Sequence, residues 1–284
     1  MATLSFQSAV VAGFVGNSAA SYAFTLLGQA LWPVPTVLYS NHPAGRGHAG
    51  EVVSAALDGR IVAALEKNGL MAEVGQVLTG YLGHADQADV VLAALASSRR
   101  LNPGVRYICD PVLGDMGSGR YVAAEIGHAI RGRLVPASDI VTPNHFELTY
   151  LLGAPATTAA AVWAAAARLQ ALGPQTVVVT SVVTAETPRD RIDTFLLEGT
   201  SAWAIRTPRI DTPAHGAGDL LTALLAARLA AGEPSTVEAL SHAVSSVYGV
   251  LLQTGCSADL ALPAAGHEIL TPTHLFQAVP TRPF

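Results

Sequence analysis

Short apolar runs alternate with helix-like patterns along most of this chain. Runs rich in β-branched residues and bounded by Gly, Pro or Asp predict strands. These predicted strands cover residues 8–13, 34–40, 75–80, 105–110, 138–142 and 175–181. Ala- and Leu-rich stretches between them predict helices at residues 18–27, 51–66, 85–99, 121–131, 144–152 and 158–172. Apolar strands that alternate with helices are typical of an α/β fold whose mostly parallel central sheet has helices on both faces.

The pattern changes after residue 190. Residues 191–199 and 201–208 predict a hairpin or two adjacent edge strands, and two long helices follow at residues 218–231 and 236–253. The sequence contains no linker, internal repeat or low-complexity segment. We therefore expect a single domain that spans residues 1–284.

The composition indicates a large buried core. Half of the residues are hydrophobic and only 13% are charged, which argues against a disordered chain. A net charge of −5 and the lack of any Lys/Arg run argue against a nucleic-acid partner. The two cysteines, Cys109 and Cys256, lack the spacing of a metal site. So few cysteines are typical of a reducing compartment, and we expect a cytoplasmic protein.

Residues 1–45 contain no Asp, Glu, Lys or Arg, which raises the question of a membrane anchor. Glycines, prolines and polar side chains break each apolar run well short of the roughly 18 residues that a membrane-spanning helix needs. A secretory signal would begin with a Lys or Arg, and this segment has neither. Residues 148–167 are also uncharged, but Gly153 and Pro155 divide them. We expect no membrane segment.

Four polar clusters come directly after predicted strands. They read SNHPAGRGHAG from Ser40, TGYLG from Thr79, DPVLGDMGSG from Asp110 and TPNHFE from Thr142. The carboxyl ends of parallel strands meet at one edge of a sheet, and α/β proteins bind their ligands there. We therefore expect these four clusters to share one site.

The residues Gly216, Ala217 and Gly218 precede an apolar helix whose first turn carries Asp219. Glycine lets the backbone approach a ligand closely, and a helix start presents free amides and the positive end of the dipole. This combination suits an anion such as a phosphoryl group. The motif alone leaves two roles open for Asp219. It either stabilises its own helix, by about 0.3–1 kcal/mol, or acts on a ligand held beside it.

Two further acidic motifs each have a structural and a functional interpretation. Asp110 and Asp115 flank a glycine-rich loop, which suits water-mediated Mg²⁺ binding together with phosphate oxygens. The alternative is a solvated Asp-Pro turn. Asn144 and Glu147 have the spacing of a helix capping box, and the same pair also suits a metal ion or a phosphate. For this second motif both roles can hold at once.

Other catalytic signatures are absent from the sequence. It has no HExxH, no paired histidine spacing and no Cys/His cluster, which argues against a catalytic zinc site. It also lacks the P-loop and G-x-S-x-G patterns. The stretch GFVGNSAA lacks the third glycine of a dinucleotide fingerprint, so Gly13 and Gly16 predict a close-packed turn into the next helix.

Seven fragments carry a resemblance when they are taken together. The most specific are FQSAVVAGFVGNSAA from Phe6 and TVLYSNH from Thr36. The others are TGY from Thr79, CDPVLGD from Cys109, TPNHFE from Thr142, VVVTS from Val177 and GAGDL from Gly216. In this order they resemble the pyridoxal kinases of the ribokinase-like superfamily, over nearly the whole chain. The sugar kinases of the superfamily do not share the first two fragments.

The resemblance implies a role for each matching residue. Asp219 matches the catalytic base of the family, and the amides of Gly216, Ala217 and Gly218 match its anion hole. Asp110, Asp115 and Glu147 match the acids around Mg²⁺ and a monovalent cation such as K⁺. Together with these acids, Asn144 and Thr180 match residues near the ATP phosphates. The residues that match the pyridoxal pocket are Ser8, Val15, His42 and Tyr81. The family also implies ATP as co-substrate and a homodimer.

This chain departs from the family pattern at four positions. Ala9 stands where the family often has His, Pro43 where many members have Thr, and His48 where an aromatic residue often covers the pyridine ring. These three changes line the expected vitamin pocket, so they bear on which form of the vitamin is preferred. Ala217 replaces a usual Thr, and an anion hole made of backbone amides tolerates that change.

The expected function is an ATP-dependent kinase that phosphorylates the 5′-hydroxymethyl group of pyridoxal in vitamin B6 salvage. Phosphoryl transfer depends on positioning and charge neutralisation more than on covalent chemistry, and the motifs supply both. One alternative is a hydroxymethylpyrimidine kinase on the same fold. Another is a non-catalytic protein that binds pyridoxal or pyridoxal phosphate, although such a protein has no use for a base.

Overall fold

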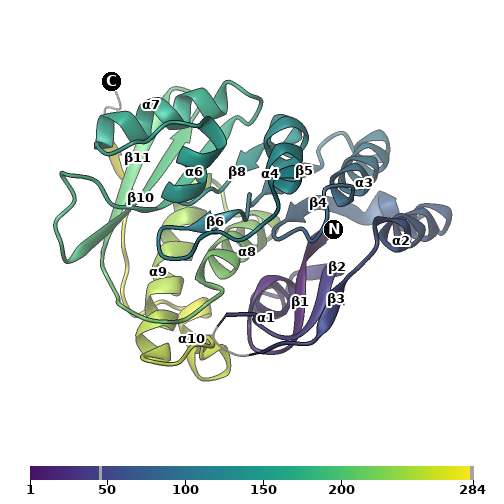
Figure 1. Cartoon of the computed structure of the whole chain (residues 1–284), viewed down its shortest axis with the longest axis horizontal. Coiled ribbons are helices and arrows are strands. Elements are labelled where there is room, and N and C mark those ends of the chain that lie inside the picture. The colour runs from purple at the N-terminus through teal and green to yellow at the C-terminus, as the bar shows by residue number, and fades with distance from the viewer. Residues whose placement is uncertain (45–46, 282–284) are drawn as a thin grey trace.

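A central sheet of ten strands organises the described part of the chain, residues 1–44 and 47–281 of a computed structural model (Figure 1). In spatial order these strands are β12 (Val279–Thr281), β11 (Ser201–Pro208), β10 (Arg191–Glu198), β9 (Thr176–Val182), β8 (Ile140–Val141), β5 (Arg106–Cys109), β4 (Val74–Thr79), β1 (Ala2–Ala12), β2 (Ala30–Asn41) and β3 (Gly50–Val52). The six strands from β9 to β2 run parallel, and both ends of the sheet continue antiparallel. The α/β prediction with a mostly parallel sheet is confirmed, and so is the predicted hairpin, formed by β10 and β11.

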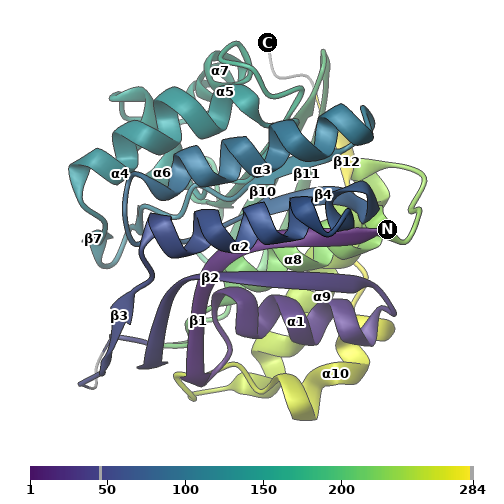
Figure 2. The same ribbon diagram turned by 90° about the vertical axis from the view of Figure 1, so that its right-hand side faces the viewer.

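Helices cover both faces of this sheet (Figures 1 and 2). One face carries α2 (Ala55–Lys67), the short η1 (Leu70–Glu73), α3 (Gln87–Leu101), α4 (Ala124–Ala129), η2 (Ile130–Leu134), α5 (Val135–Ala137), α6 (His145–Leu152) and α7 (Ala159–Gln170). The other face carries α1 (Gly16–Leu26), α8 (Ala217–Ala230), α9 (Thr236–Thr254) and α10 (Leu262–Leu270). Among the described residues, no helix combines the length and the apolar character needed to cross a membrane.

Neighbouring residues of the inner strands β4 and β5 pack into opposite cores, because side chains alternate across a strand. In β4, Val77 packs with α2–α7 while Leu78 packs with α1 and α8–α10. Tyr107 and Ile108 of β5 divide in the same way. A strand that is buried on both faces is rich in apolar residues, which explains continuous apolar runs such as Val177–Val179 in β9.

Two predicted helices differ from the observed elements at their starts. The helix expected from residue 51 begins at Ala55, because Gly50–Val52 pair with β2 as strand β3 and Ser54 caps the helix by accepting from the Leu57 amide. The helix expected from residue 121 begins at Ala124 and widens into one π-helical stretch, Ile130–Leu134. The pattern also placed the first strand at residues 8–13, whereas β1 begins at Ala2, and it did not predict β3, β6, β7, α10 or β12.

The order of the strands places the expected site. The connection through α1 leads from β1 to β2 on one side, and the chain then returns to place β4 on the other side of β1. Such a reversal opens a crevice at the carboxyl ends of the strands. These ends point to the left in Figure 2, where β3 and the hairpin of β6 (Gly114–Asp115) and β7 (Gly119–Arg120) also lie.

Candidate active site

Asp219 lies at the point where two helices begin. It is in the first turn of α8, yet its side chain makes no capping bond to that helix. Its Oδ2 instead accepts a hydrogen bond of 2.8 Å from the backbone N–H of Gly16, the first residue of α1. Asp219 therefore hydrogen-bonds to the start of a second helix, while its place in the first turn of α8 keeps it next to the positive end of its own helix, so both roles stay open.

Glycines allow the two helix starts to approach each other. Gly16 has φ +51°, and a Cβ there would lie 2.3 Å from Ser8 Oγ and 2.4 Å from Ser8 O. Gly216 has φ +92°, and a Cβ there would lie 2.2 Å from the carbonyl oxygen of Phe14. Both positions combine left-handed backbone with space for hydrogen alone, which is the condition that requires glycine. The predicted close-packed turn at Gly16 is confirmed.

Asp110 follows β5 and is almost fully buried, with 6% of its surface exposed. Its Oδ2 accepts from the Thr222 hydroxyl at 3.0 Å, and the Thr222 oxygen lies 3.0 Å from that of Thr142. Thr222 comes one turn after Asp219 on α8, so both side chains face the ends of the strands. A chain of hydroxyls thus orients Asp110 from two neighbouring elements.

Glu147 and Asn144 form the predicted capping box at the start of α6. The Asn144 side chain accepts from the Glu147 amide, and Glu147 accepts from the Asn144 amide at 2.8 Å. The other Glu147 oxygen accepts from the Leu113 amide at 2.9 Å, which ties α6 to the loop after β5. Asn144 also donates to the carbonyl of Gly114. The pair therefore fixes the loop that carries the next acidic residue.

Asp115 belongs to the β6–β7 hairpin. Its Oδ1 accepts from the amides of Gly117 and Ser118 at 2.8 Å and 2.5 Å, so Asp115 shapes its own turn. The hairpin still approaches the other acids. The charges of Asp115, Asp110, Glu147 and Asp219 all raise the pKa of Tyr121, which follows β7, although burial is the largest cause. The four predicted acids therefore surround one region of the molecule.

The acids perturb each other because they are buried together. Burial, then the charges of Glu147 and Asp219, raise the pKa of Asp110 well above its ordinary value. Burial raises the pKa of Glu147 to about 8, even though three backbone amides favour its anion. Burial also raises the pKa of Asp219 to about 6, against the hydrogen bond from Gly16. Crowded carboxylates with raised pKa values are typical of a site completed by a cation or adapted for proton transfer.

Among the described residues, no three His, Cys, Asp or Glu side chains are placed to hold a metal ion by themselves. This arrangement differs from a protein-only metal cage. It is compatible with Mg²⁺, which keeps most of its waters and is held through one or two carboxylates and a bound phosphate. Asp110, Glu147 and Asp115 are the groups available for that purpose.

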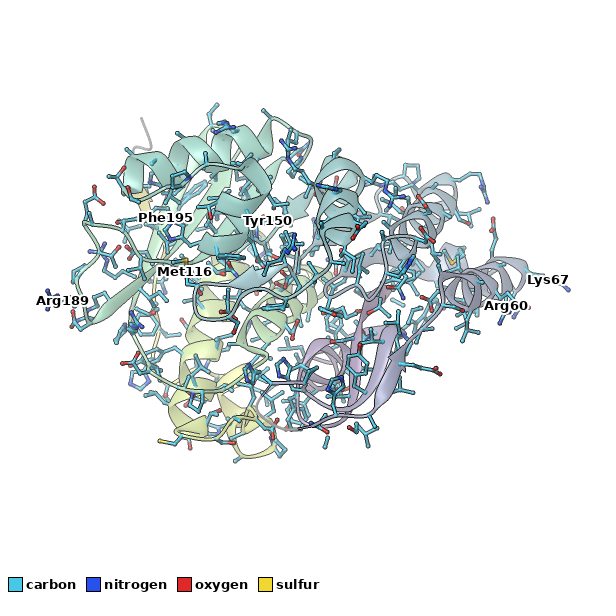
Figure 3. All side chains as sticks on the ribbon, in the orientation of Figure 1. Arg60, Lys67, Met116, Tyr150, Arg189 and Phe195 are labelled. Carbon is cyan, nitrogen blue, oxygen red and sulfur yellow. The ribbon has the colours of Figure 1, made fainter. Side chains whose placement is uncertain are left out.

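A cavity of about 1040 Å³ opens beside Asp115, and the other three acids do not line it. It is lined by five of the predicted residues: Asp115, Asn144, Thr180, Ala217 and Gly218. Its far wall is apolar and includes Leu221, Val244 and Leu251. Figure 3 shows Met116 at the tip of the β6–β7 hairpin, on the rim of this cavity. Polar groups at one end and an apolar wall at the other suit a ligand with a phosphate chain and a flat apolar ring.

Two of the predicted vitamin-pocket residues lie close to the starts of α1 and α8. Ser8 lies in β1 against Gly16, and Val15 is the N-cap of α1, with its Cγ1 3.2 Å from where a Cβ of Gly216 would be. Tyr81 follows β4, and Tyr39 is close enough to influence its pKa, which burial raises. Tyr39 in turn packs edge-on against His48, with ring centroids 4.9 Å apart. His42 lies at the end of β2, where its ring meets His215.

Three residues of this region carried no signal in the sequence. Ser181, beside Thr180 on the cavity wall, has φ +54°, and among the described residues it is the only non-glycine with positive φ. Tyr121 lies close enough to all four acids for their charges to raise its pKa. His215 precedes the anion-hole glycine and stacks on His42. Backbone conformation and contacts between distant loops leave no local pattern, so only the structure reveals these positions.

Comparison with known proteins finds kinases of pyridoxal and of a related pyrimidine. Residues 53–259 match the phosphomethylpyrimidine kinase family model. A pyridoxal kinase of Corynebacterium diphtheriae is 40% identical over 259 residues, 91% of each chain. One of Rubrobacter xylanophilus is 38% identical and covers 95% of this chain and 93% of its own. The solved pyridoxal kinase of Leishmania donovani with ADP and pyridoxamine is 26% identical, with a TM-score of 0.92 and 99% of both chains covered.

Proposed function

This chain belongs to the pyridoxal kinase family, and we propose that it transfers the γ-phosphoryl group of ATP to the 5′-hydroxymethyl group of pyridoxal. The product is pyridoxal 5′-phosphate, and the role is vitamin B6 salvage. Membership is established by the family match over residues 53–259 and by relatives about 40% identical along nine-tenths of the chain. The fold is ribokinase-like.

The position of Asp219 between two helix starts carries the proposal. The amides of Gly216, Ala217 and Gly218 form an anion hole at the end of the cavity, and Asp219 lies beside it, on the side of Ser8 and Val15. ATP in the cavity and pyridoxal in the pocket then meet at this carboxylate. Nucleophile and electrophile are held in one rigid frame, which supplies much of the rate of phosphoryl transfer.

In the proposed reaction, Asp219 accepts a hydrogen bond from the substrate hydroxyl. The hydroxyl oxygen bonds to the γ-phosphorus while the bond from that phosphorus to the β-γ bridging oxygen breaks, and the proton passes to Asp219. The anion-hole amides hold the transferred group. A pKa of about 6 leaves Asp219 mostly ionised near pH 7 and still basic enough to take the proton late.

We further propose that Mg²⁺ accompanies ATP, with Asp110, Asp115 and Glu147 as its carboxylate partners. The ion neutralises phosphate charge. The support is an excess of buried carboxylates in a site whose described acids form no closed ligand set. The same excess supports a monovalent cation such as K⁺ in this region. Asn144 and Thr180, which line the cavity, are proposed to contact the phosphates.

For the vitamin pocket we propose Ser8, Val15, His42 and Tyr81. Their support is that loops distant in sequence bring them to one side of Asp219. The family model is named for phosphomethylpyrimidine kinase, so a hydroxymethylpyrimidine acceptor is the main rival. The match to that model begins at residue 53 and leaves out the block that contains Ser8, Val15 and His42.

A single assay tests the assignment. Purified protein with Mg²⁺-ATP is given pyridoxal, pyridoxine, pyridoxamine or hydroxymethylpyrimidine, and ADP release is measured with a no-acceptor control. Pyridoxal should give the highest kcat/KM. A higher value for hydroxymethylpyrimidine reassigns the substrate. No ADP release with any acceptor, alongside tight pyridoxal binding, would instead indicate a non-catalytic binding protein.

Three broader features are also proposed. The chain forms one domain, supported by the continuous ten-stranded sheet among the described residues. It is cytoplasmic, supported by the free thiols of Cys109 and Cys256. It forms a homodimer, supported by the exposed apolar side chains of Val11 and Leu38 on the adjacent strands β1 and β2. Light scattering of the wild type and of Val11→Asp tests this last point.

A further inference from the structure

Two imidazole rings from distant segments stack face to face beside the anion hole. The ring centroids of His42 and His215 lie 4.0 Å apart, with an angle of 17° between the ring planes. His42 follows β2, whereas His215 directly precedes Gly216, the N-cap of α8. The contact therefore joins the vitamin side of the site to the segment that leads into the phosphate side.

That segment, residues 209–216, is called the strap. One side of the strap is held by the loop after α9: Thr212 Oγ1 donates to the Gly255 carbonyl at 2.9 Å, and the His215 amide donates to the Ala258 carbonyl at 3.0 Å. The last strap residue, Gly216, presses on the Phe14 carbonyl. The His215 ring adds a further contact, to His42 after β2. The direction in which the chain enters α8 thus depends on the two contacts of His215, its hydrogen bond to Ala258 and its stack on His42.

The surroundings of His42 favour its neutral form. Burial and the charges of His215 and His48 lower the pKa of His42, while Asp259 acts in the opposite direction. Asp259 lies on the loop after α9 and approaches Gly13, where an added Cβ would be 2.7 Å from its Oδ1. The turn before α1 contributes no titratable group, and within the strap Asp211 pairs with Arg209.

We propose that His215 is a positioning residue, which sets the anion-hole amides through its stack on His42. This rests on the proposed kinase function. His215 itself need not touch the vitamin. Because the anion hole serves every acceptor, loosening the stack should lower kcat for pyridoxal, pyridoxine and pyridoxamine by the same factor. A residue that contacts the variable substituent of the vitamin would change the three values unequally.

The decisive comparison is His215→Ala against His215→Phe. Alanine removes the stack, whereas phenylalanine keeps a flat ring over His42. We expect kcat of His215→Ala to fall about 2- to 10-fold for all three vitamers, the range of one aromatic pair. His215→Phe should restore kcat to within 2-fold of wild type. His128→Ala, which alters an exposed histidine on α4, is the matched control and should change nothing.

Hydrogen exchange gives a readout that does not need turnover. Peptides covering residues 209–216 should exchange at least 3-fold faster in His215→Ala than in wild type or His215→Phe, because the stack no longer holds the strap. Unchanged exchange, unequal kcat factors among vitamers, or failure of phenylalanine to restore kcat would each overturn the proposal. If the wild type phosphorylates no vitamer, the kinase function fails, and exchange alone still decides whether the stack holds the strap.

Discussion

The carboxylate of Asp219 accepts a hydrogen bond from the amide of Gly16, 2.8 Å away, and each residue belongs to the first turn of a different helix. The positive ends of α1 and α8 therefore converge on one carboxylate and on the space beside it. Burial nevertheless raises the pKa of Asp219 to about 6. The result is a group that is anionic near neutral pH and can still accept a proton.

Replacing Asp219 by Asn should reduce kcat by about 10²–10⁴-fold, the range for loss of a general base. Asparagine can still accept the hydrogen bond from Gly16, so both helix starts remain in place. ATP and pyridoxal should bind with near wild-type affinity, measured by calorimetry. The matched control is Asp89→Asn, a first-turn carboxylate of α3 that pairs with Arg133 on the exposed side.

The same variant should be at least as stable as wild type at pH 8. In the folded protein the pKa of Asp219 exceeds its ordinary value of 3.8, so ionising it costs stability as the pH rises through about 6. Asparagine avoids that cost. A thermal melt several degrees lower, with normal turnover, would instead indicate a structural carboxylate.

The pH dependence of kcat/KM should follow Asp219. Since the base must be ionised, activity should fall tenfold per pH unit below about 6 and level off above that value. Initial rates between pH 5 and 8 at fixed ionic strength measure this limb. A rate that is unchanged down to pH 5 rules out a base with a raised pKa.

Mg²⁺ with ADP should stabilise the protein more at pH 8.5 than at pH 6. Burial raises the pKa of Glu147 to about 8 and that of Asp110 well above its usual range, so the ligand-free protein loses stability as both ionise with rising pH. A cation neutralises the charges. Melting curves with and without Mg²⁺-ADP measure the difference, and Asp110→Asn should reduce it.

Asp115→Ala should raise the Mg²⁺ concentration needed for half-maximal activity by about tenfold, and excess Mg²⁺ should restore most of the rate. The alternative is that Asp115 only shapes the turn at Gly117 and Ser118. Full activity of the variant at limiting Mg²⁺ would support that alternative. Glu147→Gln is a less specific test, because it also weakens the cap of α6.

Gly16→Ala should destabilise the protein and abolish activity. The added methyl group would overlap Ser8, and alanine disfavours φ +51°. Gly59→Ala is the matched control. Gly59 lies inside α2 with no atom within 4 Å of an added Cβ. Alanine there should raise the free energy of unfolding of the protein by about 0.5–1 kcal/mol. Chemical denaturation of both variants tests the contrast.

The sequence predicted the sheet well because its strands are buried on both faces. Runs such as Val177–Val179 leave little choice of structure, and the confirmed hairpin of residues 191–208 has the same origin. Edge elements were harder to predict. Gly50–Val52 are exposed and form a strand only because β2 offers its open edge, which is a tertiary effect that local pattern does not contain.

The sequence could predict that the candidate residues lie near one another, but not the geometry of their contacts. Strand ends located the clusters of Asp110 and Asn144, the glycines around Asp219 marked an anion site, and Thr180 came from the family resemblance alone. The hydrogen bond from Gly16 to Asp219 and the stack of His215 on His42 depend on how distant loops meet. No spacing rule within the sequence could specify them.

The two residues joined at the centre of the site are 203 positions apart in the chain. We expect contacts of such long range to be among the last to form during folding. Closing a long loop lowers the chain entropy before the favourable free energy of the new contacts is gained. A growing chain that ends before α8 therefore contains the vitamin-side loops and most of the acids, but not the proposed base or the anion hole. Refolded samples should regain helical and sheet signals before they regain turnover. Enzymatic activity should therefore appear only once folding is complete. A partly folded molecule should have no activity, rather than a reduced activity.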